Sequence, residues 1–137
     1  MRGVLVDAGP LVALIDADDA HHGGCVETLK SLRDPLITVW PAFTEAMYLL
    51  SDSWQGQRAL WSRIETDGLT LAPLESGDAP RMRELMEKYR DLPMDFADAA
   101  LVRVAEREGL TRIFTLDRRH FSIYQPGRRR RFAILPA

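Results

Sequence analysis

The chain has 137 residues, 46% of them hydrophobic, which suits one globular domain with a sizeable core. Its formal net charge of -2 is close to neutral, so total charge argues neither for nor against a nucleic-acid partner. The single cysteine excludes an intramolecular disulfide, and neither a cationic leader nor a membrane-spanning apolar run is present, so we expect one cytoplasmic domain over residues 1–137.

The first predicted element is a buried strand over residues 4–6 that ends in a carboxylate. Its sequence, Val-Leu-Val, is apolar throughout, as in a strand that is covered on both faces, and Asp7 follows directly. A Gly-Pro pair then turns the chain into a helical run. Ligands of open parallel α/β sheets bind at the carboxyl ends of strands, so Asp7 is the first candidate site residue.

A helix from about Ala20 to Leu32 is predicted next, followed by a strand over residues 35–41. The adjacent residues His21 and His22 do not share a helix face, so we interpret them as exposed or capping residues and not as metal ligands. Cys25 has no cysteine partner, and we interpret it as a small packed residue and not as a nucleophile.

Pro41 starts a predicted helix that carries Glu45. Phe43, Met47 and Leu50 lie on one side of this helix, and Glu45 lies on a different stripe. Two interpretations of Glu45 stay open from local sequence. It is either a first-turn acid that favours the helix dipole or a member of an acidic site.

The following elements are assigned no chemistry. They are a helix over residues 54–67 that Gly68 ends, a short strand over residues 69–74, and a helix through Met82 and Tyr89 with a turn and cap at residues 76–78.

The most informative segment is a helix that begins after Pro93 and ends at Gly109. Asp95 is its expected N-cap, and Asp98 lies in its first turn. At a spacing of three residues, the two carboxylates point into nearby space, where like charges repel unless a cation lies between them. A pair of capping acids at a helix N-terminus is the alternative interpretation.

The strand predicted over residues 113–117 repeats the opening arrangement, because Asp117 stands at its carboxyl end. If this strand is a parallel neighbour of residues 4–6, both strand-end acids emerge at one edge of the sheet. The N-termini of the two acid-bearing helices open at the same edge. Four or five converging carboxylates are costly without counter-charge, and oxygen ligands suit Mg²⁺ or Mn²⁺, so a divalent metal site is predicted.

Arginines dominate the segment that follows. Arg118 and Arg119 come directly after the strand-end acid, and we predict that their guanidinium groups bind substrate phosphates. The four arginines at 128–131 have two open interpretations. They form either a further phosphate contact or a solvated turn into an edge strand at 132–135, where charge prevents aggregation.

The acidic motifs, taken in order, resemble those of the PIN domain family, and most closely the VapC-type toxin ribonucleases of bacterial and archaeal toxin and antitoxin pairs. The resemblance covers nearly the whole chain and rests on four motifs: Val6-Asp7-Ala8-Gly9-Pro10-Leu11, Thr44-Glu45-Ala46, Asp98-Ala99-Ala100-Leu101-Val102 and Thr115-Leu116-Asp117. It implies an α/β fold, a three-layer α/β/α sandwich with a central parallel sheet.

The resemblance also implies an activity and partners. The activity is Mg²⁺- or Mn²⁺-dependent cleavage of RNA phosphodiesters by an endoribonuclease, and the partners are a cognate antitoxin protein and a second copy in a homodimer. The catalytic and metal-binding acids carried over are Asp7, Glu45, Asp98 and Asp117, with Asp95 as an additional acid that part of the family carries. Thr115 matches the motif hydroxyl that orients a carboxylate or water, and it joins Arg118 and Arg119 as a substrate-binding candidate.

Two other classes of function stay open. A metal-dependent phosphatase on a doubly wound sheet also uses a strand-end Asp, but its usual second acid is replaced here by Gly9, and Lys30 and Lys88 are the only lysines. A non-catalytic, partner-binding PIN-like module would keep the acids only as helix caps.

Overall fold

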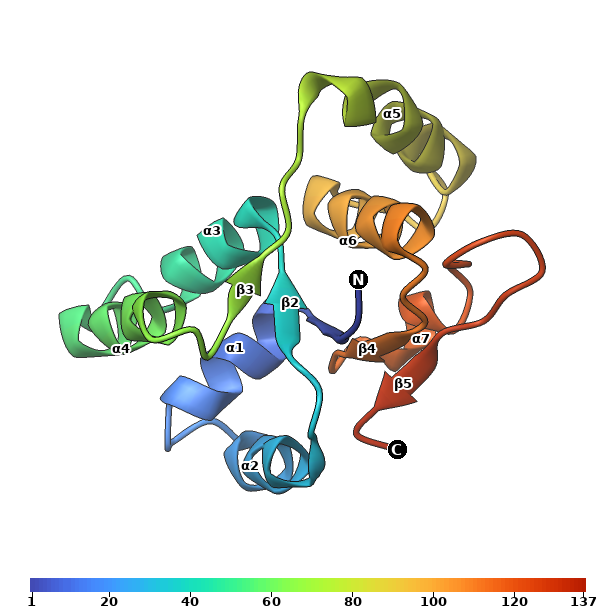
Figure 1. Cartoon of the computed structure of the whole chain (residues 1–137). Helices are drawn as coiled ribbons and strands as arrows, with labels where there is room; N and C mark the ends of the chain where they lie inside the picture. The colour runs from blue at the N-terminus through green and yellow to red at the C-terminus, as the bar shows by residue number, and fades with distance from the viewer.

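The computed structural model describes residues 1–137 and has a central sheet of five parallel strands, with helices on both faces (Figure 1). The spatial order is β3-β2-β1-β4-β5. The strands are β1 (Val4–Val6), β2 (Leu36–Thr38), β3 (Thr70–Leu71), β4 (Arg112–Phe114) and β5 (Ala133–Leu135). The predicted three-layer α/β/α fold with a parallel sheet is confirmed.

Six of the seven α-helices match predicted helical segments. The helices are α1 (Ala8–Ile15), α2 (His22–Ser31), α3 (Trp40–Leu49), α4 (Trp54–Glu65), α5 (Ala79–Lys88), α6 (Phe96–Glu108) and α7 (Arg118–Phe121). The sequence did not predict α7, because four residues are too few to show a hydrophobic period. A single 3₁₀ turn, Ser76–Asp78, precedes α5.

The direction in which successive strands are added to the sheet reverses at β1. The chain runs outward from β1 to β2 and β3, and then crosses to the other side of β1 for β4 and β5. β1 and β4 are parallel neighbours, as expected, with Val6 opposite Phe114. Asp7 and Asp117, which follow these strands, therefore emerge at the topological switch point, where ligands bind in open α/β sheets.

Side chains of β1 alternate between two cores. Leu5 belongs to the core under α5, α6 and α7, whereas Val4 and Val6 belong to the core under α1, α2, α3 and α4. The predicted packing of Cys25 is confirmed, since it is fully buried in the second core. Nδ1 of His22 lies 2.7 Å from the carbonyl oxygen of Ala13, a contact that ties α2 to α1.

The edge strand β3 is shorter than predicted. It spans two residues, whereas the apolar run predicted a strand over residues 69–74. The ladder to β2 ends with the hydrogen bond from Ala72 to Thr38, and the next residue, Pro73, has no N–H to donate.

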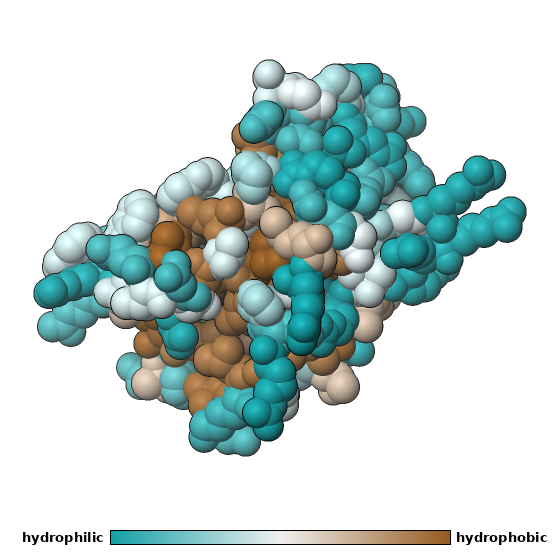
Figure 2. All heavy atoms as spheres, viewed as in Figure 1, coloured by the Kyte–Doolittle hydropathy of each residue, from teal (hydrophilic) through white to brown (hydrophobic).

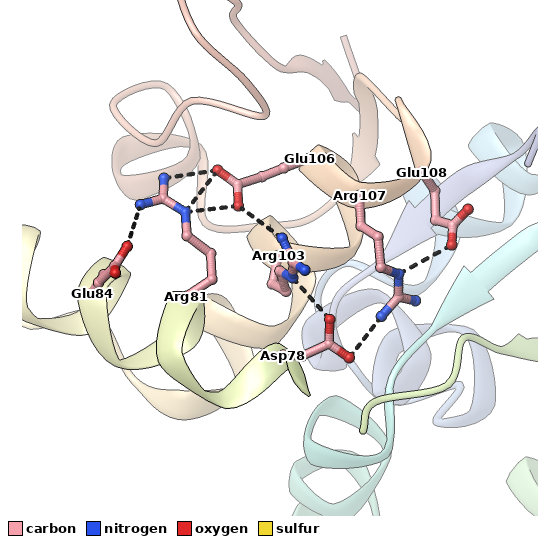
Figure 3. Close-up of polar contacts among 7 residues, drawn as sticks. All are labelled: Asp78, Arg81, Glu84, Arg103, Glu106, Arg107 and Glu108. Atoms are coloured by element: carbon pink, nitrogen blue, oxygen red, sulfur yellow. Dashed lines mark hydrogen bonds and ion pairs between the residues drawn. The ribbon is translucent and has the colours of Figure 1, made fainter. Parts of the chain in front are cut away.

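Ion pairs fasten α5 to the C-terminal half of α6 (Figure 3). The carboxylate of Asp78, just before α5, accepts hydrogen bonds at 2.9 Å from Arg103 and from Arg107. Arg81 of α5 forms a two-pronged pair with Glu106 of α6, at 2.9 and 2.8 Å. Such bidentate geometry fixes the position of one helix against the other.

Asp78 is stabilised as an anion by its surroundings. Its carboxylate accepts a hydrogen bond from the backbone N–H of Glu75, and this contact together with Arg103 and Arg107 lowers the pKa of Asp78 to about 2, against the opposing effect of burial. The sequence predicted a turn and cap at residues 76–78. The ion pairs of Asp78 with α6 are an addition from tertiary structure.

Hydrophobic side chains reach the surface over β2, β3 and α1, while the surface around α5 is mostly hydrophilic (Figure 2). A small hollow in the apolar region is lined mainly by aliphatic side chains: Leu11, Leu14, Ile15, Leu36, Leu60 and Leu69. No helix has the length and apolar character needed to cross a membrane.

Candidate active site

Asp7 is held firmly at the carboxyl end of β1. As the N-cap of α1, it accepts a hydrogen bond from the backbone N–H of Ala8 at 2.8 Å, and its second oxygen accepts one from the hydroxyl of Thr115, also at 2.8 Å. Burial nevertheless raises the pKa of Asp7, and the charges of Asp95 and Asp117 add to the rise. Asp7 is therefore a well-oriented carboxylate in acidic surroundings.

Thr115 links the two strand-end acids. It is fully buried, and its hydroxyl donates to Asp7 and accepts the backbone N–H of Asp117 at 3.0 Å. The structure thus places Thr115 as a residue that orients Asp7. Its buried hydroxyl is occupied by contacts within the protein, in contrast to the open surface expected of a substrate-binding group.

Glu45 projects from the middle of α3, and its side chain is exposed. Partial burial of its carboxyl raises the pKa of Glu45, and the charges of Asp95 and Asp7 raise it further. Its position in the sixth residue of α3 does not fit the alternative of a first-turn acid at the helix N-terminus. Glu45 therefore faces the same acidic region as the strand-end carboxylates.

Asp95 and Asp98 lie together at the N-terminus of α6. Asp95 is the N-cap, and its carboxylate accepts the backbone N–H of Asp98 at 2.8 Å, so the predicted cap is confirmed. Burial, followed by the charges of Asp95 and Asp7, raises the pKa of Asp98 to about 8. A hydrogen bond from the hydroxyl of Tyr124, at 3.0 Å, opposes this rise.

Asp117 forms the N-cap of the short helix α7. One oxygen accepts the backbone N–H of His120 at 3.2 Å, and the other lies 2.7 Å from Nδ1 of the same His120. When the Asp117 carboxylate is ionised it only accepts hydrogen bonds, and Nδ1 of His120 is then the donor in this contact.

The five acids influence one another without forming a closed ligand set. Each of Asp7, Glu45 and Asp98 has a pKa raised by the charge of at least two of the others. No group of three or more His, Cys, Asp or Glu side chains converges on one point at ligand distances. The donor chemistry, carboxylate oxygens without thiolate, still fits a hard divalent cation such as Mg²⁺ or Mn²⁺.

A groove of about 710 Å³ opens beside Glu45 and Asp95. Three aromatic side chains on its walls are unusually exposed for their size: Trp40 at 49%, Tyr48 at 76% and Phe96 at 50%. The acidic region is therefore bordered by ring faces that solvent reaches.

The arginines after Asp117 differ in their side-chain contacts. Both Arg118 and Arg119 are exposed, but Arg118 donates a hydrogen bond to the backbone carbonyl of Pro136, whereas Arg119 has no ion pair. The run at residues 128–131 is exposed, and Arg131 donates to the carbonyl of Ser122 at 3.2 Å. Arg119 is the freer of the two predicted phosphate-binding residues.

Sequence reasoning missed His120 and Tyr124, which contact two of the candidate acids. The spacing of three residues between Asp117 and His120 is a signal that one helical turn brings them together. Tyr124 and Asp98 are 26 residues apart, and no local pattern connects them.

Comparisons with known proteins identify the family of this chain. The family model of the PIN domain matches residues 4–125. Ribonuclease VapC26 of Mycobacterium tuberculosis strain ATCC 25618 / H37Rv is 29% identical over 135 residues, which are 97% of this chain and 100% of that protein.

Two solved structures share the fold. The crystal structure of Mycobacterium tuberculosis VapC20, a sarcin-ricin loop cleaving toxin, has a TM-score of 0.75 at 18% identity and covers 81% of this chain and 87% of its own. A toxin-antitoxin complex from Klebsiella pneumoniae has a TM-score of 0.69 at 17% identity, with coverage of 92% and 96%.

Proposed function

The chain belongs to the PIN domain family, and from this premise we propose that it is a Mg²⁺- or Mn²⁺-dependent endoribonuclease, the toxin of a toxin-antitoxin pair. The proposal takes residues 1–137 as one PIN-like domain, since β1 and β5, from opposite ends of the chain, belong to the same sheet.

One observation carries this proposal. Carboxylates from the ends of β1 and β4, from α3 and from α6 gather near the switch point of the sheet, where burial and the charges of neighbouring acids raise the pKa values of Asp7, Glu45 and Asp98. Such crowding costs stability and is typical of a site that binds a cation. The match to Ribonuclease VapC26 over nearly the whole chain supports RNA as the substrate.

In the proposed mechanism, Asp7, Asp98 and Asp117 would hold the divalent ion and Glu45 would complete the acidic set, with Asp95 beside it. When bound there, such an ion supplies a water of lowered pKa as nucleophile and offsets charge on the phosphodiester. The contacts from Thr115 keep the Asp7 carboxylate oriented, which avoids reorganisation when RNA binds. No nucleophile from the protein is required.

The surroundings of the acids suit a nucleic-acid strand. Exposed rings of Trp40, Tyr48 and Phe96 in the adjoining groove offer faces on which unpaired bases stack. We propose that Arg119 binds a phosphate, supported by its exposed side chain, whereas Arg118 would do so only by exchanging its contact with Pro136.

We propose a cognate antitoxin protein as the partner, and the fold shared with the Klebsiella pneumoniae toxin-antitoxin complex supports it. The apolar surface over β2, β3 and α1 suits contact with another protein. A homodimer and a cytoplasmic location, where RNA is available, complete the proposal.

The test is incubation of the purified protein, freed of any partner, with mixed cellular RNA in Mn²⁺ or in EDTA. We expect discrete internal cleavage in Mn²⁺ and none in EDTA. Asp98→Asn should reduce cleavage more than Asp95→Asn, because Asp98 matches the family motif and Asp95 is the helix cap. Equal losses in the two variants would place Asp95 among the direct ligands.

Two other outcomes would replace the proposal. Release of inorganic phosphate from small phosphomonoesters, with RNA left intact, would identify a phosphatase. Inertness toward both substrates in Mn²⁺ would favour a partner-binding module whose acids serve only as caps.

A further inference from the structure

The short segment from Thr115 to Tyr124 supplies a hydrogen-bond donor to each of three candidate carboxylates. Thr115 donates to Asp7, and the two residues that the family motifs do not include, His120 and Tyr124, contact Asp117 and Asp98. Three acids from separate elements are thus oriented by one stretch of ten residues.

Tyr124 is built into this position. Its side chain is fully buried, and its ring packs edge-on against Tyr89 and Phe121, at centroid distances of 5.0 and 5.1 Å. Only the hydroxyl reaches the site, where it lies 3.0 Å from Oδ2 of Asp98. A phenol with so few degrees of freedom fixes the direction from which Asp98 receives its hydrogen bond.

His120 is held by the same cluster. Its ring is stacked on Tyr124 at 6.2 Å, with an interplanar angle of 16°, and Nδ1 lies 2.7 Å from Oδ2 of Asp117. The backbone N–H of His120 contacts the other oxygen of Asp117. Both oxygens of the Asp117 carboxylate therefore contact His120.

Hydrogen bonds of this kind leave a carboxylate able to bind a cation. Each oxygen has two lone pairs, so one accepted hydrogen bond does not exhaust it. Groups behind metal-binding side chains set their orientation, and removal of such a group commonly costs 10- to 100-fold in metal affinity.

We propose that Tyr124 and His120 are positioning residues, which hold the Asp98 and Asp117 carboxylates in the orientation that binds a divalent cation. The inference rests on the proposed function for its metal, but it concerns binding and not cleavage. Tyr124 and His120 touch neither substrate nor metal in this role, and they act through the two acids.

The test is calorimetric titration of the EDTA-treated and dialysed full chain with Mn²⁺. Tyr124→Phe removes only the hydroxyl, and we expect it to raise the Kd for Mn²⁺ about 10-fold or more. Tyr89→Phe is the matched control, because it removes a hydroxyl from the ring that packs on Tyr124, and none of the site's hydrogen bonds involves Tyr89. We expect its Kd to stay within about twofold of the wild-type value.

His120 is tested with a pair of variants. The side-chain amide of His120→Asn reproduces an N–H near the place of Nδ1 and should keep most of the affinity, whereas His120→Ala should raise the Kd about 10-fold. Thermal unfolding in EDTA checks that each variant folds. A purely structural role would lower the midpoint of unfolding in EDTA and leave the Kd for Mn²⁺ unchanged.

The inference is overturned if Tyr124→Phe and His120→Ala bind Mn²⁺ as tightly as the wild type, or if the wild type does not bind Mn²⁺. The expected ratios of Kd in a protein that cleaves no RNA would support the positioning roles and refute the proposed ribonuclease. If Tyr124→Phe binds Mn²⁺ with the wild-type Kd and also cleaves RNA at the wild-type rate, the positioning role is refuted and the proposed ribonuclease is retained.

Discussion

The two ends of helix α6 differ in the charged groups that surround them. At its N-terminus, Asp95 and Asp98 face further carboxylates, and burial with mutual repulsion raises the pKa of Asp98 to about 8. At its C-terminal half, Arg103 and Arg107 meet Asp78, whose pKa falls to about 2 (Figure 3). One end of the helix concentrates like charges, and the other pairs opposite charges.

This difference distinguishes a binding site, at the N-terminus of α6, from a set of structural ion pairs, at its C-terminal half. At the paired end, each buried charge is compensated by its partner, and removal of one partner leaves an uncompensated charge in the folded state. Crowded carboxylates raise the free energy of the folded state, and a ligand of opposite charge can recover the loss. The acidic end should therefore respond to mutation through activity, and the paired end through stability.

The largest expected effect is the loss of cleavage in Asp7→Asn. We expect a decrease of at least about 100-fold in the rate of RNA cleavage, since the central carboxylate loses its charge. The fold should stay intact or become more stable in EDTA, because the substitution relieves repulsion from Asp95 and Asp117. Cleavage assays measure the rate, with Glu65→Gln as an exposed control, and thermal unfolding measures the stability. Full activity in Asp7→Asn would remove Asp7 from the site.

The converse change lies at the paired end. Asp78→Ala leaves Arg103 and Arg107 without their carboxylate, and we expect a loss of about 2–3 kcal/mol in the free energy of unfolding. Cleavage per folded molecule should not change. Urea unfolding measures the loss, and Glu87→Ala, which breaks an exposed pair on α5, should cost less than about 0.5 kcal/mol. A comparable loss in both variants would contradict the distinction between buried and exposed pairs.

The pH dependence of stability should have opposite signs at the two ends. The raised pKa of Asp98 contributes stability that is complete below the unfolded value of 3.8 and is lost as the pH rises through about 8. The lowered pKa of Asp78 contributes stability that is present above 3.8 and is lost as the pH falls through about 2.

Urea unfolding in EDTA tests these signs. Between pH 6 and pH 8, the wild type should lose about 1–2 kcal/mol, and Asp98→Asn should lose less. Between pH 4 and pH 2, Asp78→Asn should lose less stability than the wild type. An Asp98→Asn variant with the wild-type slope between pH 6 and pH 8 would show that Asp98 is not crowded.

The smallest effect concerns the positive charges beside the acidic end. Under conditions in which RNA is not cleaved, Arg119→Ala should raise the Kd for RNA a few-fold. The slope of log Kd against log salt concentration should fall by about one, because one phosphate contact is lost. Metal affinity should stay nearly the same. Arg58→Ala, at an exposed position on α4, is the control, and filter binding at several salt concentrations measures both. A change only when residues 128–131 are replaced would move the RNA path to that loop.

Much of this arrangement follows from local sequence. Apolar residues before Asp7 and before Asp117 predict two buried strands, and their parallel pairing at the switch point is confirmed. The cap at Asp95 and the helix end at Gly109, which adopts a positive φ of 70°, are also local signals that the structure confirms.

Other features depend on contacts between distant residues. The hydroxyl of Tyr124 meets Asp98 only because the chain after α7 passes close to the first turn of α6, and no periodicity carries that information. Asp78 looks like an ordinary capping acid in sequence, and its ion pairs require that α5 lie on α6.

The order of strands in the sheet also has a consequence for the time at which the site can exist during synthesis. β1, which precedes Asp7, pairs with β4, more than 100 residues later, and β4 is in turn flanked by β5 at residues 133–135. The backbone N–H of Thr115 donates to Leu135 at that last strand. The acids therefore assemble only after the ribosome has released residues as far as β5, and a nascent chain shorter than this lacks the assembled acidic region.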